Sequence, residues 1–200
     1  MNGTEPCATK PRSLWLRALT LLTTELVEME PQLRAYNLAM GLLPRRNGAK
    51  ARVKVLRALG FTVGSGTEIK GPLKLSGARG IVGKLRIGQS CNIDAECTFE
   101  VSDALTIGDR VTIEPGVMIL TSTHELDFSQ HRAGKLVTGP VSIGAGAWLR
   151  ARAIILPGVE IGTGAVVDAG AIVDKNVADH TRVGGMPAAP LEVLRKSDEA

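Results

Sequence analysis

Few side chains in this sequence could act as a base or a nucleophile near neutral pH. The candidates are three histidines and three cysteines: His124, His131, His180, Cys7, Cys91 and Cys97. A neutral imidazole, with a pKa of about 6.5, can take the proton of a hydroxyl group as that oxygen attacks a carbonyl carbon. His124 is the candidate base, because it ends a regular repeat just before a segment, 125–136, that breaks it. A side chain at the root of a loop on a rigid scaffold is well placed to act.

The other candidates have weaker claims. His131 lies inside the interruption and His180 lies beyond the repeat. Cys91 and Cys97 occupy successive small positions of the repeat, which predicts core packing rather than reactivity. An odd number of cysteines without a Cys-x-x-Cys motif indicates a reducing, cytoplasmic compartment.

A catalytic imidazole needs an orienting partner on its second ring nitrogen. Glu114, Glu125, Asp127 or a backbone carbonyl could serve, and spacing alone does not choose among them.

A repeat of six residues must position these side chains. Large apolar residues recur at every sixth position over Val63–Phe99, Ile107–Ile119 and Val137–Val173. Six residues fit one short strand and one corner, and three such units make a triangular coil of 18 residues. Coils stack at the interstrand distance of about 4.8 Å. The repeat therefore predicts an all-β solenoid, a parallel β-helix of about five to six coils. The usual crossover rule taken alone favours right-handed coils.

The composition agrees with narrow coils and excludes several other classes. The chain has only six aromatic residues among 200, with 23 glycines and 10 prolines. It is too apolar for a disordered chain, lacks the glycine period of collagen, and has too few rings to stack on single-stranded nucleic acid. Its net charge of +4 comes from cations and anions mixed along the chain, so no nucleic-acid partner is predicted.

The chain divides near residue 60. The spacing of apolar residues predicts a helical segment over residues 1–60, with helices over 13–29, 31–43 and 49–59. Gly60 is expected to end the third helix. Residues 61–178 form the β-helix with a loop at 125–136, and 179–200 form a partly helical tail. The third helix is cationic, so peripheral contact with anionic lipid is a weaker alternative to a simple helical cap. No early segment is apolar enough to span a membrane.

Four motifs resemble the hexapeptide-repeat acyltransferases, most closely the sugar O-acetyltransferases that include the maltose, galactoside, nodulation-factor and surface-polysaccharide enzymes. They are Ile143-Gly144-Ala145-Gly146-Ala147-Trp148, Leu156-Pro157-Gly158-Val159-Glu160-Ile161-Gly162, Gly184-Gly185-Met186-Pro187-Ala188, and Ile119–His124 with Leu126 and Asp127. The resemblance covers residues 63–195. It implies a left-handed coil, a homotrimer with sites in the clefts between subunits, acetyl-CoA as the acyl donor, and no metal.

The resemblance also implies roles for single residues. His124 corresponds to the general base. Acceptor contacts are expected from Asp103, Glu96 and Asp127. Donor contacts are expected from Trp148, Arg150, Ala151, Ala169, Lys175 and Arg195. Two departures stand out: Arg150 replaces a frequent glycine, so it either contacts CoA phosphates or narrows the groove, and Asp174 replaces a frequent threonine.

Three functions remain open at this stage. The leading hypothesis is O-acetylation of a saccharide or another hydroxylated small molecule. The second is N-acetylation of an amino sugar or sugar nucleotide on the same scaffold. The third is a non-catalytic or metal-binding β-helix.

Overall fold

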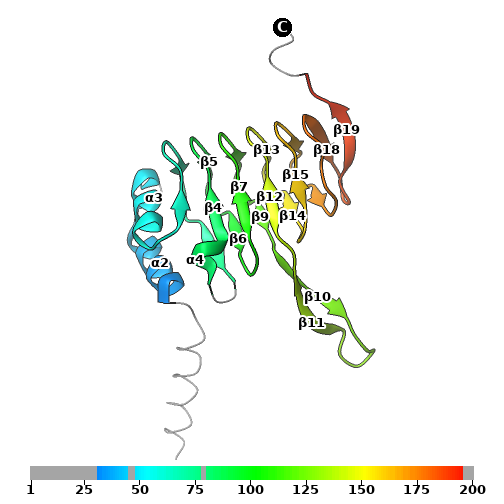
Figure 1. The fold of residues 1–200 in the computed structure, drawn as a ribbon, viewed down its shortest axis with the longest axis horizontal. Helices are drawn as coiled ribbons and strands as arrows, with labels where there is room; N and C mark the ends of the chain where they lie inside the picture. Colours follow the sequence, from blue (N-terminus) through cyan, green and yellow to red (C-terminus); the bar gives the residue numbers. More distant parts are fainter. Residues whose placement is uncertain (1–30, 45–47, 78–79, 196–200) are drawn as a thin grey trace, which may run out of the picture.

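The computed structural model describes residues 31–44, 48–77 and 80–195. Within these ranges, short parallel strands stack into three sheets that form the faces of a triangular prism (Figure 1). The helix predicted over 13–29 lies outside the described residues.

Each sheet takes one strand from each of the first five coils, and sheet B continues with two further strands. Sheet A contains β1 (Thr62–Val63), β4 (Leu85–Ile87), β7 (Leu105–Ile107), β12 (Val141–Ile143) and β15 (Glu160–Ile161). Sheet B contains β2 (Glu68–Ile69), β5 (Asn92–Ile93), β8 (Thr112–Ile113), β13 (Trp148–Leu149), β16 (Val166–Val167), β18 (Thr181–Gly184) and β19 (Ala189–Val193). Sheet C contains β3 (Lys74–Ser76), β6 (Thr98–Glu100), β9 (Met118–Ile119), β14 (Ile154–Ile155) and β17 (Ile172–Val173).

The repeat sets the register of the coils. Trp148 pairs with Val166 and Ile154 pairs with Ile172, each 18 residues further along the chain. The large apolar residues point inward, as predicted: Ile69, Ile93, Ile113, Leu149 and Val167 are all buried. Prediction and structure differ at Val137, which lies only half-buried outside the coils. The coils resume at Val141 instead, because the inserted segment between coils is longer than the break in the pattern suggests.

Two helices cover the first coil, α2 (Pro31–Leu42) and α3 (Ala49–Ala58) (Figure 1). The buried hydroxyl of Tyr36 on α2 donates to the Leu73 carbonyl at 2.6 Å. Gly60 follows α3 with a φ of +93°, a left-handed conformation that glycine adopts at little cost. A short helix that the repeat did not predict, α4 (Ile81–Lys84), precedes β4, and its Ile81 is still buried.

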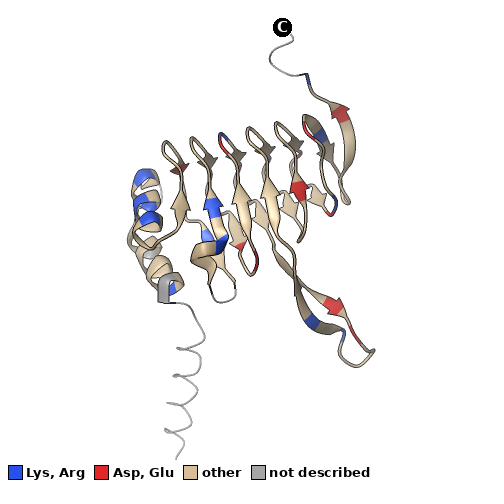
Figure 2. Cartoon of the chain, viewed as in Figure 1, with Lys and Arg blue, Asp and Glu red and all other residues tan. Residues whose placement is uncertain are grey.

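The cations of α3 do not all face outward. Arg52 is 1% exposed, and its guanidinium donates to the carbonyls of Ile69, Lys70 and Pro44. It satisfies backbone oxygens at the end of the prism, which otherwise carry a desolvation cost. Lys50 and Lys54 remain exposed on this helix. Figure 2 shows in blue the basic segments along α3.

The prediction of a partly helical tail is wrong for residues 179–195. β18 pairs with β16 as the next coil strand, and β19 then returns antiparallel to β18. Pro187 and Pro190 fall within this stretch, and each lacks the N–H that a continuing helix needs. Among the described residues, no helix is long and apolar enough to cross a membrane.

Candidate functional site

His124 lies on a β-hairpin that projects from the prism (Figure 1). The hairpin consists of β10 (Ser122–Leu126) and β11 (Ala133–Thr138), in which His124 pairs with Leu136. The prediction of a loop over 125–136 is therefore wrong for half of that segment, because 125–126 and 133–136 belong to the two strands. The period of six is lost there because the strands leave the coil, although Val137 and Thr138 carry the β-branched side chains that favour strands.

A backbone carbonyl orients the His124 ring. Nδ1 of His124 lies 2.8 Å from the carbonyl oxygen of Gly134 across the hairpin. A carbonyl can only accept a hydrogen bond, so Nδ1 carries the proton and Nε2 keeps its lone pair. The ring is exposed, so Nε2 is accessible to a ligand as a proton acceptor. Of the partners left open by the sequence, the structure selects the backbone carbonyl rather than Glu114, Glu125 or Asp127.

The root of the hairpin holds one predicted residue and two that the sequence argument missed. Asp103 accepts the N–H of Ala104 at 2.7 Å, and its own N–H donates to the buried Thr121 hydroxyl at 2.9 Å. The Ala104 N–H, followed by the Thr138 side chain, holds the pKa of the Asp103 carboxyl below its ordinary value. Glu100 accepts the N–H of Thr121 at 2.9 Å. Glu100 and Thr121 are the two residues that the sequence argument missed. The only signal for them in the sequence is that each lies beside a corner of the coil.

Three other predicted residues meet at a different corner. Glu96, Ala151 and Ala169 line one open cavity of about 550 Å³, together with Pro115, Gly116, Arg152 and Gly170. This corner joins sheet B to sheet C, whereas the His124 hairpin leaves the corner that joins sheet C to sheet A. Glu96 has a φ of +63° here and also lines a second cavity, beside Met40 and Leu43 near α2.

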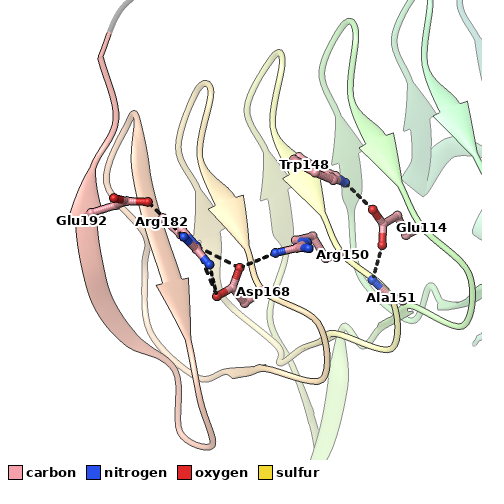
Figure 3. A network of polar contacts seen from close by, with 7 residues as sticks. All are labelled: Glu114, Trp148, Arg150, Ala151, Asp168, Arg182 and Glu192. Carbon is pink, nitrogen blue, oxygen red and sulfur yellow. Dashed lines mark hydrogen bonds and ion pairs between the residues drawn. The ribbon is translucent and has the colours of Figure 1, made fainter.

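The Trp148 ring lies next to that corner and is fixed by a carboxylate (Figure 3). The indole Nε1 donates to Glu114 Oε1 at 2.9 Å, and the N–H of Ala151 donates to Glu114 Oε2 at 2.8 Å. The Arg150 guanidinium lies 5.1 Å from the centre of the indole ring, in cation–π contact. Glu114 is thus the link between two residues that the sequence assigned separately to donor binding.

Arg150 is also engaged in an ion-pair network on sheet B (Figure 3). Its Nη1 lies 3.1 Å from Asp168 Oδ1, and the same carboxylate accepts from Arg182 Nε at 3.0 Å. Arg182 reaches on to Glu192 of β19 at 3.1 Å. The Arg150 side chain is therefore held against sheet B by Asp168 and by the Trp148 ring.

Substituting Asp168→Asn is expected to lower the melting temperature by about 2–4 °C at neutral pH, and by a smaller amount at a pH well below 3.8. Hydrogen bonds from Arg182, then from Arg150, lower the pKa of Asp168 below its ordinary 3.8. A depressed carboxyl pKa stabilises the fold above the ordinary value, and that contribution is lost as the pH falls through the folded-state pKa. Thermal melts of the wild type and of Asp168→Asn at the two pH values test this expectation. Asp174→Asn, an exposed carboxylate, is the control; an equal effect of Asp168→Asn at both pH values would contradict the assignment.

The remaining predicted residues lie apart from the cavity. Lys175 is exposed just after β17, at the corner between sheets C and A that also carries the hairpin. Asp127 is exposed beyond β10 and accepts the N–H of Phe128 at 2.7 Å. Arg195 is exposed just beyond β19. One chain therefore groups His124, Asp103 and Lys175 at one corner, and it groups Ala151 and Ala169 at another.

The cysteines pack as predicted. Cys91 is 2% exposed and Cys97 is fully buried. Burial raises the pKa of both thiols, that of Cys97 to about 11. Neither side chain is a nucleophile at neutral pH. Within the described ranges, no three His, Cys, Asp or Glu side chains are grouped as metal ligands.

Comparison with known proteins gives the family. Residues 140–175 match the family model described as the hexapeptide repeat of succinyl-transferase. A Schizosaccharomyces pombe protein assigned as an acetyltransferase is 32% identical over 166 residues, covering 81% of this chain and 78% of that protein. The chain therefore belongs to the hexapeptide-repeat acetyltransferases.

Solved structures agree with this assignment. A maltose O-acetyltransferase from Clostridium difficile superposes with a TM-score of 0.74 at 26% identity, covering 86% of this chain and 88% of that one. A Vibrio cholerae hexapeptide-repeat acetyltransferase solved with acetyl-CoA has a TM-score of 0.70 at 26% identity, covering 82% and 86%. The prism is a left-handed parallel β-helix of about six turns. The handedness that the resemblance implied is therefore confirmed, and the right-handed coil favoured by the crossover rule is wrong for this chain.

Proposed function

We propose that this chain transfers the acetyl group of acetyl-CoA to a hydroxyl of a saccharide or a similar hydroxylated small molecule, with His124 as the general base. One observation carries the proposal: the Gly134 carbonyl holds the Nδ1 proton, which leaves Nε2 exposed as the proton acceptor. Nε2 takes the hydroxyl proton as the hydroxyl oxygen attacks the thioester carbon. The same nitrogen then returns the proton to the departing CoA sulfur, giving an ester and free CoA.

We further propose that the active enzyme is a homotrimer whose sites lie between subunits. The separation of the two corners supports it, since the corner with Ala151 and Ala169 is not the corner from which the His124 hairpin projects. A neighbouring copy can bring its hairpin, with Asp103 and Lys175 at the hairpin's corner, to this cavity. In that arrangement the exposed Ala169 is available to the pantetheine arm, and Lys175 offers a flexible charge to a phosphate.

A transfer screen tests the acceptor. Acetyl-CoA is incubated with maltose, methyl galactoside, glucosamine and a sugar nucleotide, while released CoA thiol and product mass are followed. Glucosamine carries an amine and hydroxyls together, so its product separates the two chemistries. We expect an alkali-labile ester. An alkali-stable amide would favour the N-acetyltransferase alternative. An absence of both transfer and acetyl-CoA binding would favour a non-catalytic assembly protein.

A further inference from the structure

The Glu100 carboxylate is not accounted for by donor or acceptor binding. Glu100 ends β6, one coil before the His124 hairpin, and is only partly exposed. Its Oε1 accepts the N–H of Ser102 at 2.9 Å. Its Oε2 accepts the N–H of Thr121 at 2.9 Å and lies 3.1 Å from the Thr121 hydroxyl. Most of its hydrogen-bonding capacity is therefore directed at the segment that leads into the hairpin.

Thr121 is the residue through which this carboxylate acts. It stands between β9 and β10, three residues before His124, and is fully buried. Its hydroxyl accepts the N–H of Asp103 at 2.9 Å and has the Glu100 carboxylate or carbonyl as the acceptor for its own proton. A buried hydroxyl with its donor and acceptor both satisfied holds one orientation, which fixes the backbone around it.

The returning strand is held at the same root. Thr138 of that strand pairs with Ser122 of the outgoing strand. The Gly139 N–H also donates to the Thr121 carbonyl at 2.9 Å. Both strands are thus joined to the prism at Thr121, which is hydrogen-bonded to Glu100 and to Asp103.

Such a root matters because the hairpin itself receives little support. Apart from Ser122, the residues of β10 are exposed, and the exposed fraction of Leu126 is 90%. An isolated two-stranded hairpin is marginally stable in water. A displacement of about 1 Å in a catalytic group can lower a rate about 100-fold. The Gly134 carbonyl orients the ring within the hairpin. Within one chain, the position of the hairpin relative to the coils is therefore set at its root.

We propose that Glu100 is a positioning residue: through Thr121 it fixes the root of the His124 hairpin and so holds the imidazole in place for proton transfer. This inference rests on the proposed role of His124 as the base. Burial alone would raise the pKa of Glu100, but the hydrogen bonds from Ser102, Thr121 and Ser122 outweigh it and lower that pKa. The carboxylate is therefore ionised, and a strong acceptor, at neutral pH.

The test compares Glu100→Gln with the pair Thr121→Val and Thr121→Ser. Hydrogen exchange of the hairpin amides is measured alongside kcat, and KM for acetyl-CoA, with the best acceptor of the panel. Glutamine keeps the size of Glu100 but replaces one acceptor by a donor. We expect Glu100→Gln and Thr121→Val to speed hairpin exchange and lower kcat by about 10-fold or more, with KM within about twofold. Thr121→Ser keeps the hydroxyl and should stay near the wild type.

Glu160→Gln, which changes an exposed carboxylate on β15, is the matched control and should change neither readout. Should Glu100→Gln itself unfold, the contrast between Val and Ser at Thr121 still decides. Unchanged exchange, or faster exchange with unchanged kcat, would overturn the positioning role. The two proposals fail differently, because full turnover in His124→Ala overturns the base assignment, whereas an inactive His124→Ala with a fully active Glu100→Gln overturns only this inference.

Discussion

His124→Ala is expected to lower kcat by at least about 100-fold while leaving the affinity for acetyl-CoA nearly unchanged. The reason is chemical: alanine removes the Nε2 lone pair, and the acceptor hydroxyl must then lose its proton to water. Binding of the donor should persist, since the predicted donor contacts come from other residues, among them Ala151 and Ala169. Steady-state release of the CoA thiol gives kcat, and calorimetry with acetyl-CoA gives the affinity.

His131→Ala is the matched control for this prediction. His131 is exposed near the tip of the same hairpin, beyond β10, and only its backbone N–H is hydrogen-bonded, to the Phe128 carbonyl. Its removal should leave kcat within about twofold of the wild type. Turnover in His124→Ala above half of the wild-type rate would show that the proton is removed by another group.

The second large effect is expected at a glycine of the corner between sheets A and B. Gly144→Ala would place a Cβ 2.5 Å from the Thr163 nitrogen and 2.6 Å from the Gly162 carbonyl carbon, both backbone atoms of the next coil. Backbone atoms cannot yield without separating the coils, so we expect a loss of about 3 kcal/mol or more. In a domain of this size, that corresponds to a fall of about 6–12 °C in melting temperature.

Gly146→Ala, two residues away, separates the cost of steric contact with the next coil from the cost of a left-handed backbone conformation. Gly146 has a φ of +70°, and nothing lies within 4 Å of the Cβ that alanine would add. Only the cost of a left-handed alanine applies, about 1 kcal/mol, or about 2–4 °C. Thermal unfolding of both variants, followed by circular dichroism, measures the contrast. Equal losses at the two positions would mean that coil contact does not set the requirement for glycine at position 144.

The coils could be predicted because their cause is local and periodic. One inward side chain every six residues defines the length of each face, so Ile113 and Leu149 identify their own environment without knowledge of any partner. The helix over 49–59 was readable for a similar reason, since Gly60 ends it. The hairpin and the C-terminal strand β19 were not readable. Their strands pair antiparallel with neighbouring strands, and the six-residue period does not predict such pairs.

The same distinction applies to the residues of the candidate site. His124 was identifiable because it ends the last regular six-residue unit before the period fails. Trp148 was identifiable because it stands where the resembled family has a tryptophan at a coil edge. The partner of His124 was not identifiable, because the Gly134 carbonyl is a backbone atom whose position depends on the hairpin register. The inward turn of Arg52 and the roles of Glu100 and Glu114 also escaped prediction. Each depends on a contact between coils, where a charge looks the same in sequence whether it faces solvent or a backbone group.

The pairing of coils across the hairpin has a consequence for how this enzyme can change. Leu105 pairs directly with Val141, and Met118 pairs directly with Ile154, so the two coils meet as though the residues between them were absent. The scaffold thus closes without help from the segment that bears His124. Insertions, deletions or exchange of the hairpin beyond its root can therefore be accepted with little loss of stability. The described coils, in contrast, stay under the much stricter demand of their period.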